Sequence, residues 1–319
     1  MLVLGAIAIL SILAIELSHR ARLDISQASR ARRDAAYRRA FSSGLEIAKG
    51  LLLEGRTNPG FDYLGDPWNR EISATLDRGI TLNIKVVDES GKLNILQAVG
   101  NGDNAEKMRK ALVRLFKHLH HLEPRRTKEW DEAEGALFKR LNLKEKQPPA
   151  PLYTLDGLRE EGLSRELLFG GTQPEAMALC DCLTTFGLGR ININTAPAPV
   201  LYALDSGLEW STVDEIIQWR GGKGQGFTGS HRPFRQVKDL EMVNGIVQKQ
   251  MINGQLHVTQ NILLKIQDQI CVNSGTYSVR IQAEAAGHSR VAWGFFELSG
   301  PLGATQESLN LVAYEEIAP

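Results

Sequence analysis

The sequence predicts an α+β protein. A long amino-terminal helix and an antiparallel sheet form one domain, and a large α-helical domain is inserted into that sheet. Three observations indicate this. Residues 2–54 read as one helix, because no proline precedes Pro59 and no glycine lies between Gly5 and Gly44. Strand-like alternation occurs early in the chain and again near its end, and the middle has helical periodicity. The chain therefore divides into a long helix (1–54), a first part of the sheet (55–96), an inserted helical domain (97–262) and a second part of the sheet (263–319).

The amino-terminal end of the predicted helix is apolar. Residues 1–15 contain one polar side chain, Ser11. Fifteen helical residues measure roughly 22 Å, which is short of the ~30 Å hydrocarbon core of a bilayer. The stretch fits a secretory signal, a span that starts upstream of Met1, or a short membrane helix supported by snorkelling flanks or partner helices. A buried helix of a soluble core is the fourth interpretation. Nearly continuous apolarity at the end of the chain favours a membrane anchor.

Two features follow along the same helix. The first is a run of arginines, and positive-inside reasoning would keep this side of the helix in the cytoplasm. These are Arg20, Arg22, Arg30, Arg32, Arg33, Arg38 and Arg39. The second is a stripe of small residues on one face, which would let partner helices approach closely, although alanine is also simply a good helix former. The stripe consists of Ala21, Ala28, Ala31 and Ala35.

Composition limits the function classes. Lys+Arg and Asp+Glu each total 37, so a net charge of zero gives no global field that would attract nucleic acid. The three cysteines cannot all pair within the chain. One disulfide, between Cys180 or Cys182 and Cys271, is expected if the body is extracytoplasmic, with the pair Cys182 and Cys271 preferred. Three reduced, buried thiols are an equally supported alternative. A zinc site is not indicated.

The strands are predicted from alternation. Residues 80–89 and 92–96 alternate around Ser90-Gly91 and predict a hairpin, after a loop over residues 55–79. Near the end of the chain, residues 276–285 and 289–298 predict a second hairpin, and 308–317 a third strand.

The inserted domain begins with two amphipathic helices, over residues 105–122 and 127–143. The first ends in His118, His120 and His121, for which a solvated helix end is favoured over a metal site. Residues 151–170 and 233–254 form a weak internal repeat in which a short helix turns at a glycine into a second short helix. This pattern is typical of helix-hairpin-helix elements. Because each turn lacks the second glycine that phosphate binding requires, a packing role is favoured.

The most distinctive motif lies between the two copies, over residues 190–204 (RININTAPAPVLYAL). It predicts a short extended segment followed by a helix capped by Asn194 or Thr195. Residues 219–234 are glycine-rich but lack the GK[ST] signature of a phosphate loop, which predicts a flexible surface insertion.

On these residues the chain resembles the minor pseudopilin K family of type II secretion. The resemblance rests on RININTAPAPVLYAL with the later PFRQVKDL segment, on Pro67-Trp68 ahead of ITLNIKVVDESGKLNIL, and on the hairpin after CVNSGTYSV. It implies a pilin-like domain, an anchor in the inner membrane, a body in the periplasm, and a place at the pseudopilus tip with two smaller minor pseudopilins. Other pilins carry a docking glutamate at position five, which this member lacks, and here that position is Gly5. The family's calcium-binding segment is represented by Asp131, Glu132 and Glu134, which a solvated helix face explains equally well.

The sequence thus predicts a non-enzymatic assembly protein with calcium as its one candidate ligand. It has no GxSxG, HExxH or nucleotide-loop signature. The alternative is a membrane-anchored DNA-binding protein of a DNA-uptake system that uses the helix-hairpin-helix copies. Neutral charge and the missing glycines argue against it, so no nucleic acid is expected as a partner. An envelope hydrolase would need a catalytic site that the sequence does not show.

Overall fold

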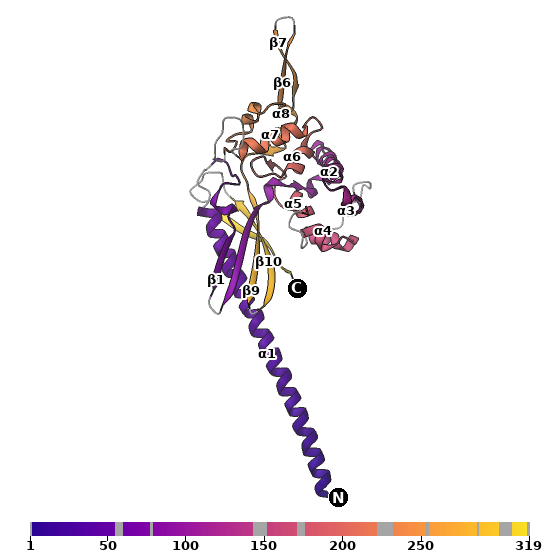
Figure 1. Cartoon of the computed structure of the whole chain (residues 1–319), viewed down its shortest axis with the longest axis vertical. Coiled ribbons are helices and arrows are strands. Elements are labelled where there is room, and N and C mark those ends of the chain that lie inside the picture. The colour runs from indigo at the N-terminus through magenta and orange to yellow at the C-terminus, as the bar shows by residue number, and fades with distance from the viewer. Residues whose placement is uncertain are drawn as a thin grey trace.

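The computed structural model describes residues 2–54, 60–76, 79–142, 152–170, 176–221, 232–252, 255–285, 287–299 and 308–317. The molecule is elongated (Figure 1). Helix α1 extends from one end, the sheet lies along its second half, and the helical insert lies beyond and beside the sheet. Most of the glycine-rich stretch 219–234 falls outside the described residues.

Helix α1 spans Leu2–Glu54, which confirms the predicted helix. From Leu13 to Arg33 its side chains are exposed, and the first fully covered residue is Tyr37. From there one face is buried, through Phe41, Ala48 and Leu52. Within the described part of the chain, no helix combines the length and apolarity needed to cross a bilayer.

The sheet is antiparallel and has five strands in the order β1-β2-β9-β10-β11. Its central pair is β2 with β9, in which Ile84 lies opposite Ile281. Because side chains alternate across a strand, Ile80, Leu82, Ile84 and Val86 of β2 lie on one face and share a core with α1. The strands are β1 (Ile72–Leu76), β2 (Ile80–Asp88), β9 (Thr276–Ala285), β10 (His288–Ser299) and β11 (Ser308–Ile317). The predicted late hairpin and third strand are confirmed.

Two glycines set how closely α1 approaches the sheet. A Cβ on Gly44 would lie 2.9 Å from Ile281 Cδ1, and a Cβ on Gly294 would lie 2.4 Å from Leu45 Cδ2. Atoms this close would overlap. The helix therefore lies directly on β9 and β10 because each side of the contact has one residue without a side chain.

The predicted early hairpin is wrong. Strand β2 pairs with β1 and β9, and the segment after it does not return alongside β2. Glu89–Gly91 forms a single 3-10 turn, and Leu93–Asn94 (β3) then pairs in parallel with Leu183–Thr184 (β4) of the insert. Ser90-Gly91 is thus where the chain leaves the sheet. Strand β1 lies in the stretch that was predicted to be a loop.

The insert is mainly helical. Its two long helices, α2 (Asp103–Leu122) and α3 (Thr127–Arg140), lie where the sequence predicts helices. Short helices follow: α4 (Arg165–Phe169), α5 (Leu179–Cys182), α6 (Ala198–Leu204), α7 (Trp210–Arg220) and α8 (Leu263–Ile266). Strand β5 (Ile191–Asn192) pairs with β8 (Ile270–Cys271). A hairpin of β6 (Val247–Ile252) and β7 (Gln255–Asn261) projects at the end of the molecule opposite the N-terminus (Figure 1).

The internal repeat is only half present as predicted. The first copy has a 3-10 helix, Leu155–Glu161, then Gly162 with φ 94°, then α4. The second copy begins in the same way, with a 3-10 helix, Val237–Met242, and Gly245 with φ 85°. It then continues into β6, so its second helix is absent. The pairing of β6 with β7 replaces the helix, and local apolar spacing gives no sign of that partner.

Two hydrophobic clusters fill the molecule. One joins α1 to the sheet and is centred on Phe41, Trp68 and Tyr277. The other fills the insert, from Leu93 to Val272. The described buried residues of each cluster come from different parts of the chain, so the sheet and the insert each have their own core.

The contact of α1 with the sheet should dominate the stability of the first core. Phe41 is fully buried, so Phe41→Ala should lower the free energy of unfolding by about 3–5 kcal/mol through lost burial and a new cavity. Urea denaturation followed by near-ultraviolet circular dichroism measures this. Leu23→Ala, on the exposed part of the same helix, is the control and should change little. Equal effects of the two substitutions would show that α1 does not hold this core together.

Candidate functional site

The distinctive motif of residues 190–204 lies at the junction between the sheet and the insert. The centre of the junction is Asp88, the last residue of β2, whose side chain is buried. Its carboxylate accepts hydrogen bonds from the Thr195 hydroxyl at 2.5 Å and the Ser274 hydroxyl at 2.5 Å. The Ser90 backbone N–H donates to its other oxygen at 2.8 Å. One carboxylate thus joins the end of β2, the motif and the segment that leads into β9.

The two asparagines of the motif extend this network. The Asn192 side-chain amide donates to Ser274 Oγ at 2.7 Å and to the Asp62 carbonyl at 3.1 Å. Asn194 exchanges two hydrogen bonds with the backbone of Phe234, at 2.9 and 2.8 Å. Both asparagines are completely buried. Because a buried amide left without partners costs about 1–3 kcal/mol, these bonds fix where the segments meet.

The predicted capping role of Asn194 or Thr195 is wrong. Helix α6 begins after Pro197, which serves as its N-cap without a side-chain hydrogen bond. The polar atoms of Asn194 and Thr195 are used in the junction instead. Local spacing suggested a cap because the same residue types satisfy helix ends. Their tertiary partners, Asp88 and Phe234, are far away in the sequence.

Gly91 allows the turn after β2 to approach the motif. A Cβ at this position would lie 2.8 Å from Thr195 Oγ1 and 3.1 Å from the Ala196 backbone nitrogen. Any side chain at residue 91 would therefore push the turn away from Thr195, which donates to Asp88. The glycine predicted to shape a hairpin is needed here for close packing.

Burial sets the electrostatics of the junction. It raises the pKa of Asp88 to about 6, partly opposed by the hydrogen bonds from Ser274 and Thr195, and Asp62 nearby adds to the rise. Glu89 and Lys92 form a buried ion pair at 2.5 Å, and the Ser278 hydroxyl of β9 donates to the same Glu89 oxygen at 2.6 Å. Burial acts to lower the pKa of Lys92, but the combined effects of Glu89, Cys180 and Asp181 outweigh it and the pKa is raised.

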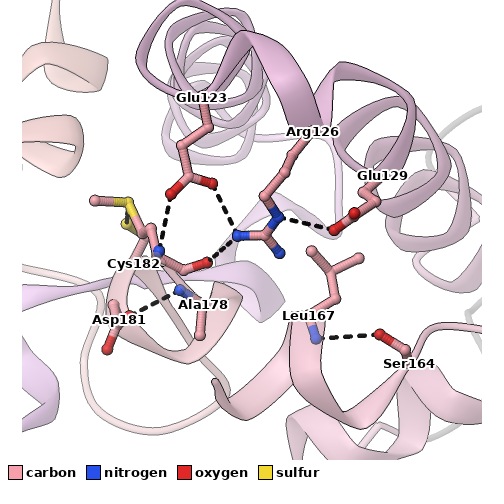
Figure 2. Close-up of polar contacts among 9 residues, drawn as sticks. Glu123, Arg126, Glu129, Ser164, Leu167, Ala178, Asp181 and Cys182 are labelled. Carbon is pink, nitrogen blue, oxygen red and sulfur yellow. Dashed lines mark hydrogen bonds and ion pairs between the residues drawn. The ribbon is translucent and has the colours of Figure 1, made fainter. Parts of the chain in front are cut away.

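A second polar cluster holds the insert together (Figure 2). Arg126 donates from Nη1 to Glu123 and to the Met177 carbonyl, both at 2.8 Å, and from Nε to Glu129 at 2.8 Å. Glu123 also accepts from the Met177 backbone N–H at 3.0 Å. The guanidinium carbon lies 4.6 Å from the centre of the Trp130 ring. Arg126 therefore ties the connection between α2 and α3 to the segment before α5, a link that sequence spacing did not indicate.

The expected disulfide is absent, which corrects the preferred pairing of Cys182 with Cys271. All three cysteines are free thiols. Cys182 is buried with its sulfur 3.7 Å from Met177 Sδ, and the Cys271 thiol donates to the Asn273 carbonyl at 3.1 Å. Burial raises the pKa of Cys180 and of Cys271 to about 12, and raises that of Cys182 further. The structure thus has the three unpaired thiols of the alternative interpretation.

The three calcium candidates do not form a site. Asp131 lies 3.3 Å from His120 Nε2, and Glu132 lies 3.9 Å from Lys128 Nζ. The pKa of Glu134 is raised by burial. Across the described residues, no group of three or more His, Cys, Asp or Glu side chains is arranged to hold a metal ion. All three carboxylates lie on α3, where Asp131 pairs with His120 of α2 and Glu132 pairs with Lys128 of α3.

The histidine cluster also differs from expectation at one residue. His118 is buried, with its ring 4.7 Å from that of Tyr202 and 4.1 Å from that of Trp210. Burial lowers its pKa to about 4, so the ring is neutral near pH 7. His121 is exposed, as expected of a solvated helix end. In the alanine stripe, Ala21, Ala28 and Ala31 are exposed and Ala35 is partly covered, so most of that face of α1 does not contact the rest of the chain.

Comparison with known proteins agrees with this architecture. Residues 191–258 match the family model described as type II secretion system (T2SS), protein K. This match begins within the junction motif. No curated protein matches the chain in sequence.

The fold is shared with a solved structure. It matches a chain in the crystal structure of the GspK-GspI-GspJ complex from the enterotoxigenic Escherichia coli type 2 secretion system. The TM-score is 0.58 at 13% sequence identity, over 91% of this chain and 100% of that chain.

A long helix on an antiparallel sheet, interrupted by a helical insert, is thus a fold that this chain shares with that crystallised chain. The match over residues 191–258 shows that this part of the chain is similar to type II secretion system protein K. Neither comparison supports the DNA-uptake alternative.

The buried carboxylate of Asp88 should make stability depend on pH in a defined direction. A folded-state pKa of about 6, above the ordinary aspartate value of 3.8, means that the folded state binds this proton more tightly than the unfolded state. The stabilisation that protonated Asp88 gives the folded state is complete below the pKa that Asp88 has in the unfolded state. It is lost as the pH rises through the pKa that Asp88 has in the folded state. The loss between about pH 4 and pH 6 should be about 2–3 kcal/mol.

Asp88→Asn removes the titration and should abolish this part of the pH dependence. Urea denaturation of both proteins across this pH range measures the difference between their free energies of unfolding. The exposed Glu132→Gln is the control and should keep the wild-type slope. Parallel pH curves for wild type and Asp88→Asn would contradict the assignment.

The thiols provide a second test. Alkylation of the unfolded protein without reductant should modify Cys180, Cys182 and Cys271, because no disulfide protects them. Intact-mass spectrometry counts the added groups, with a fully reduced sample as the reference. Under native conditions the reaction should be slow, since burial raises the pKa of each thiol. A single modified cysteine in the unreduced sample would instead indicate a disulfide.

Proposed function

We propose that this chain is a non-enzymatic minor pseudopilin at the tip of the type II secretion pseudopilus, where it initiates assembly and aids protein export across the outer membrane. The observation that carries the proposal is the position of the insert. It lies at the end of the sheet away from the protruding part of α1 (Figure 1). A filament grows by head-to-tail contacts, so a bulky domain on the upper end of a subunit blocks addition above it. Such a subunit occupies the end of the filament.

The junction supports this role. The network around Asp88 and the buried pair of Glu89 and Lys92 fix the insert to the sheet at the point where the chain crosses between them. An insert joined to the sheet only through one short hinge would move relative to the sheet. Contacts from two asparagines, two hydroxyls and an ion pair keep it in one position.

The protruding part of α1 supports the location in the inner membrane, as a single-pass protein with its body in the periplasm. The first 15 residues are almost entirely apolar. Beyond them, Leu17, Leu23 and Ile25 are 71%, 48% and 67% exposed and lie on a helix that the body does not cover. A helix of this kind is stabilised by lipid at its end and by neighbouring helices along its length.

The proposed partners are the two smaller minor pseudopilins. The matched crystal structure is of a complex named for three proteins, GspK, GspI and GspJ. In this chain the uncovered stripe of Ala21, Ala28 and Ala31 offers a surface on which partner helices could approach closely. Within this proposal the two separate cores mark a pilin-like domain and an inserted domain, and the Leu155–Phe169 segment is a helix-hairpin-helix-like packing element.

The test is reconstitution of the full chain, in detergent, with the two smaller minor pseudopilins of the same organism. Size exclusion with light scattering should give a stable 1:1:1 complex. Ala28→Leu should weaken it because the added bulk separates the helices, whereas Gln27→Leu adds an apolar side chain on a different face and should have less effect. Failure of the wild-type chain to bind either partner would overturn the proposed function.

A further inference from the structure

An open cavity lies where α1 leaves the body. It has a volume of about 330 Å³ and is formed by α1 on one side and the start of β10 on the other. The α1 side contributes Arg30 and Arg33, together with Asp34 and Tyr37. Strand β10 contributes His288, Ser289 and Arg290. The cavity thus joins segments that lie about 250 residues apart, as the Tyr37 and His288 pair illustrates with a separation of 251.

One arginine of the cavity is held in place. Arg290 Nη2 lies 2.6 Å from Asp34 Oδ1, and its guanidinium carbon lies 4.7 Å from the centre of the Tyr37 ring. The Tyr37 hydroxyl donates to the His288 carbonyl at 3.0 Å, which fixes the start of β10 against the helix. Asp34 is therefore already neutralised, and the wall of the cavity is rigid.

The other two arginines carry uncompensated charge. Within the described part of the chain, Arg30 and Arg33 form no ion pair or side-chain hydrogen bond, and both are exposed. They belong to a basic stretch of α1, residues 16–39, in which seven arginines outnumber three carboxylates for a net charge of +4. Two planar guanidinium groups in a cavity with a fixed third one are suited to an oxyanion, most directly a carboxylate bound by two N–H groups.

The length of the helix separates two possible sources of that anion. Arg30 lies 15 residues beyond Ile15, the end of the apolar stretch, or roughly 22 Å along the helix. The headgroup layer on one side of a bilayer is only about 5–8 Å thick. A helix that enters the membrane near the normal would therefore hold this cavity beyond the reach of lipid phosphates. A neighbouring protein beside α1 has no such limit.

We propose that the Arg30 and Arg33 cavity binds an acidic side chain of a neighbouring minor pseudopilin and so fixes the rotation of that partner about α1. This rests on the proposed function, which supplies the neighbour. The apolar and alanine surfaces of α1 permit close helix contact at many rotations. A carboxylate held by two arginines beside a rigid wall selects one of these rotations.

The test compares two double variants of the full chain in detergent. Arg30→Ala with Arg33→Ala should weaken binding of the two smaller minor pseudopilins roughly tenfold at low salt, with a smaller effect near 0.5 M salt, where the Debye length is only about 4 Å. Arg38→Ala with Arg39→Ala is the matched control. It removes the same charge from exposed positions of the same helix that do not line the cavity, and should change the Kd by about twofold or less.

Equal losses for the two variants would overturn the proposal in favour of a diffuse basic surface, and no loss for either would overturn it outright. Hexaglutamate is a second probe, and its binding should depend on Arg30 and Arg33. If it binds in that way although the wild-type chain binds no pseudopilin, the acid-binding cavity stands and the proposed function fails. If the cavity variant keeps its partners but loses binding to phosphatidylglycerol vesicles, the site belongs to a lipid headgroup instead.

Discussion

The architecture depends on one buried carboxylate. Asp88 ends strand β2 at the position where the chain departs into the insert, and it accepts hydrogen bonds from both sides of that departure. Burying a charge is costly unless it is well hydrogen-bonded, and the raised pKa of Asp88 reflects that cost. The motif with two asparagines and a threonine supplies most of the compensation. Its residues position the insert on the sheet.

The contact of α1 with the sheet is the second constraint, and it divides the helix by function. From Tyr37 onward the helix belongs to the core, and glycines at positions 44 and 294 allow close packing. Before Tyr37 the chain leaves the helix uncovered, with exposed apolar residues, small residues and arginines in succession. Within the proposed function, this surface suits a subunit that contacts lipid and then other helices. The boundary between the covered and the uncovered part of α1 lies at the cavity that Arg30 and Arg33 line.

The two ends of the molecule therefore have different roles within the proposed function. The uncovered helix forms contacts below, and the insert, with the β6–β7 hairpin at its far end, prevents contacts above. The rigid parts lie between them: the Arg126 cluster inside the insert, the Asp88 network at the junction, and the helix-on-sheet core. A subunit at the end of a growing filament needs such a rigid connection between its uncovered helix and its insert.

The sequence by itself determined the elements whose signal is local. Helix α1, the helices α2 and α3, and the strands β9, β10 and β11 are all visible in the spacing of apolar residues and in the absence of proline, because such patterns repeat within a few turns or strands. The motif of residues 190–204 was also recognisable as distinctive. Its importance could be predicted, but its partners could not.

Only the tertiary structure decided what each element contacts. Strand β2 pairs with β1 and β9 and not with its neighbour in sequence, and Asn194 and Thr195 bond to Phe234 and Asp88 and do not cap a helix. His118 is buried by two aromatic rings, and the three cysteines are free thiols. The same residue types satisfy local and distant partners equally well. The choice between them depends on which segments the two cores bring together, and that information is spread over the whole chain.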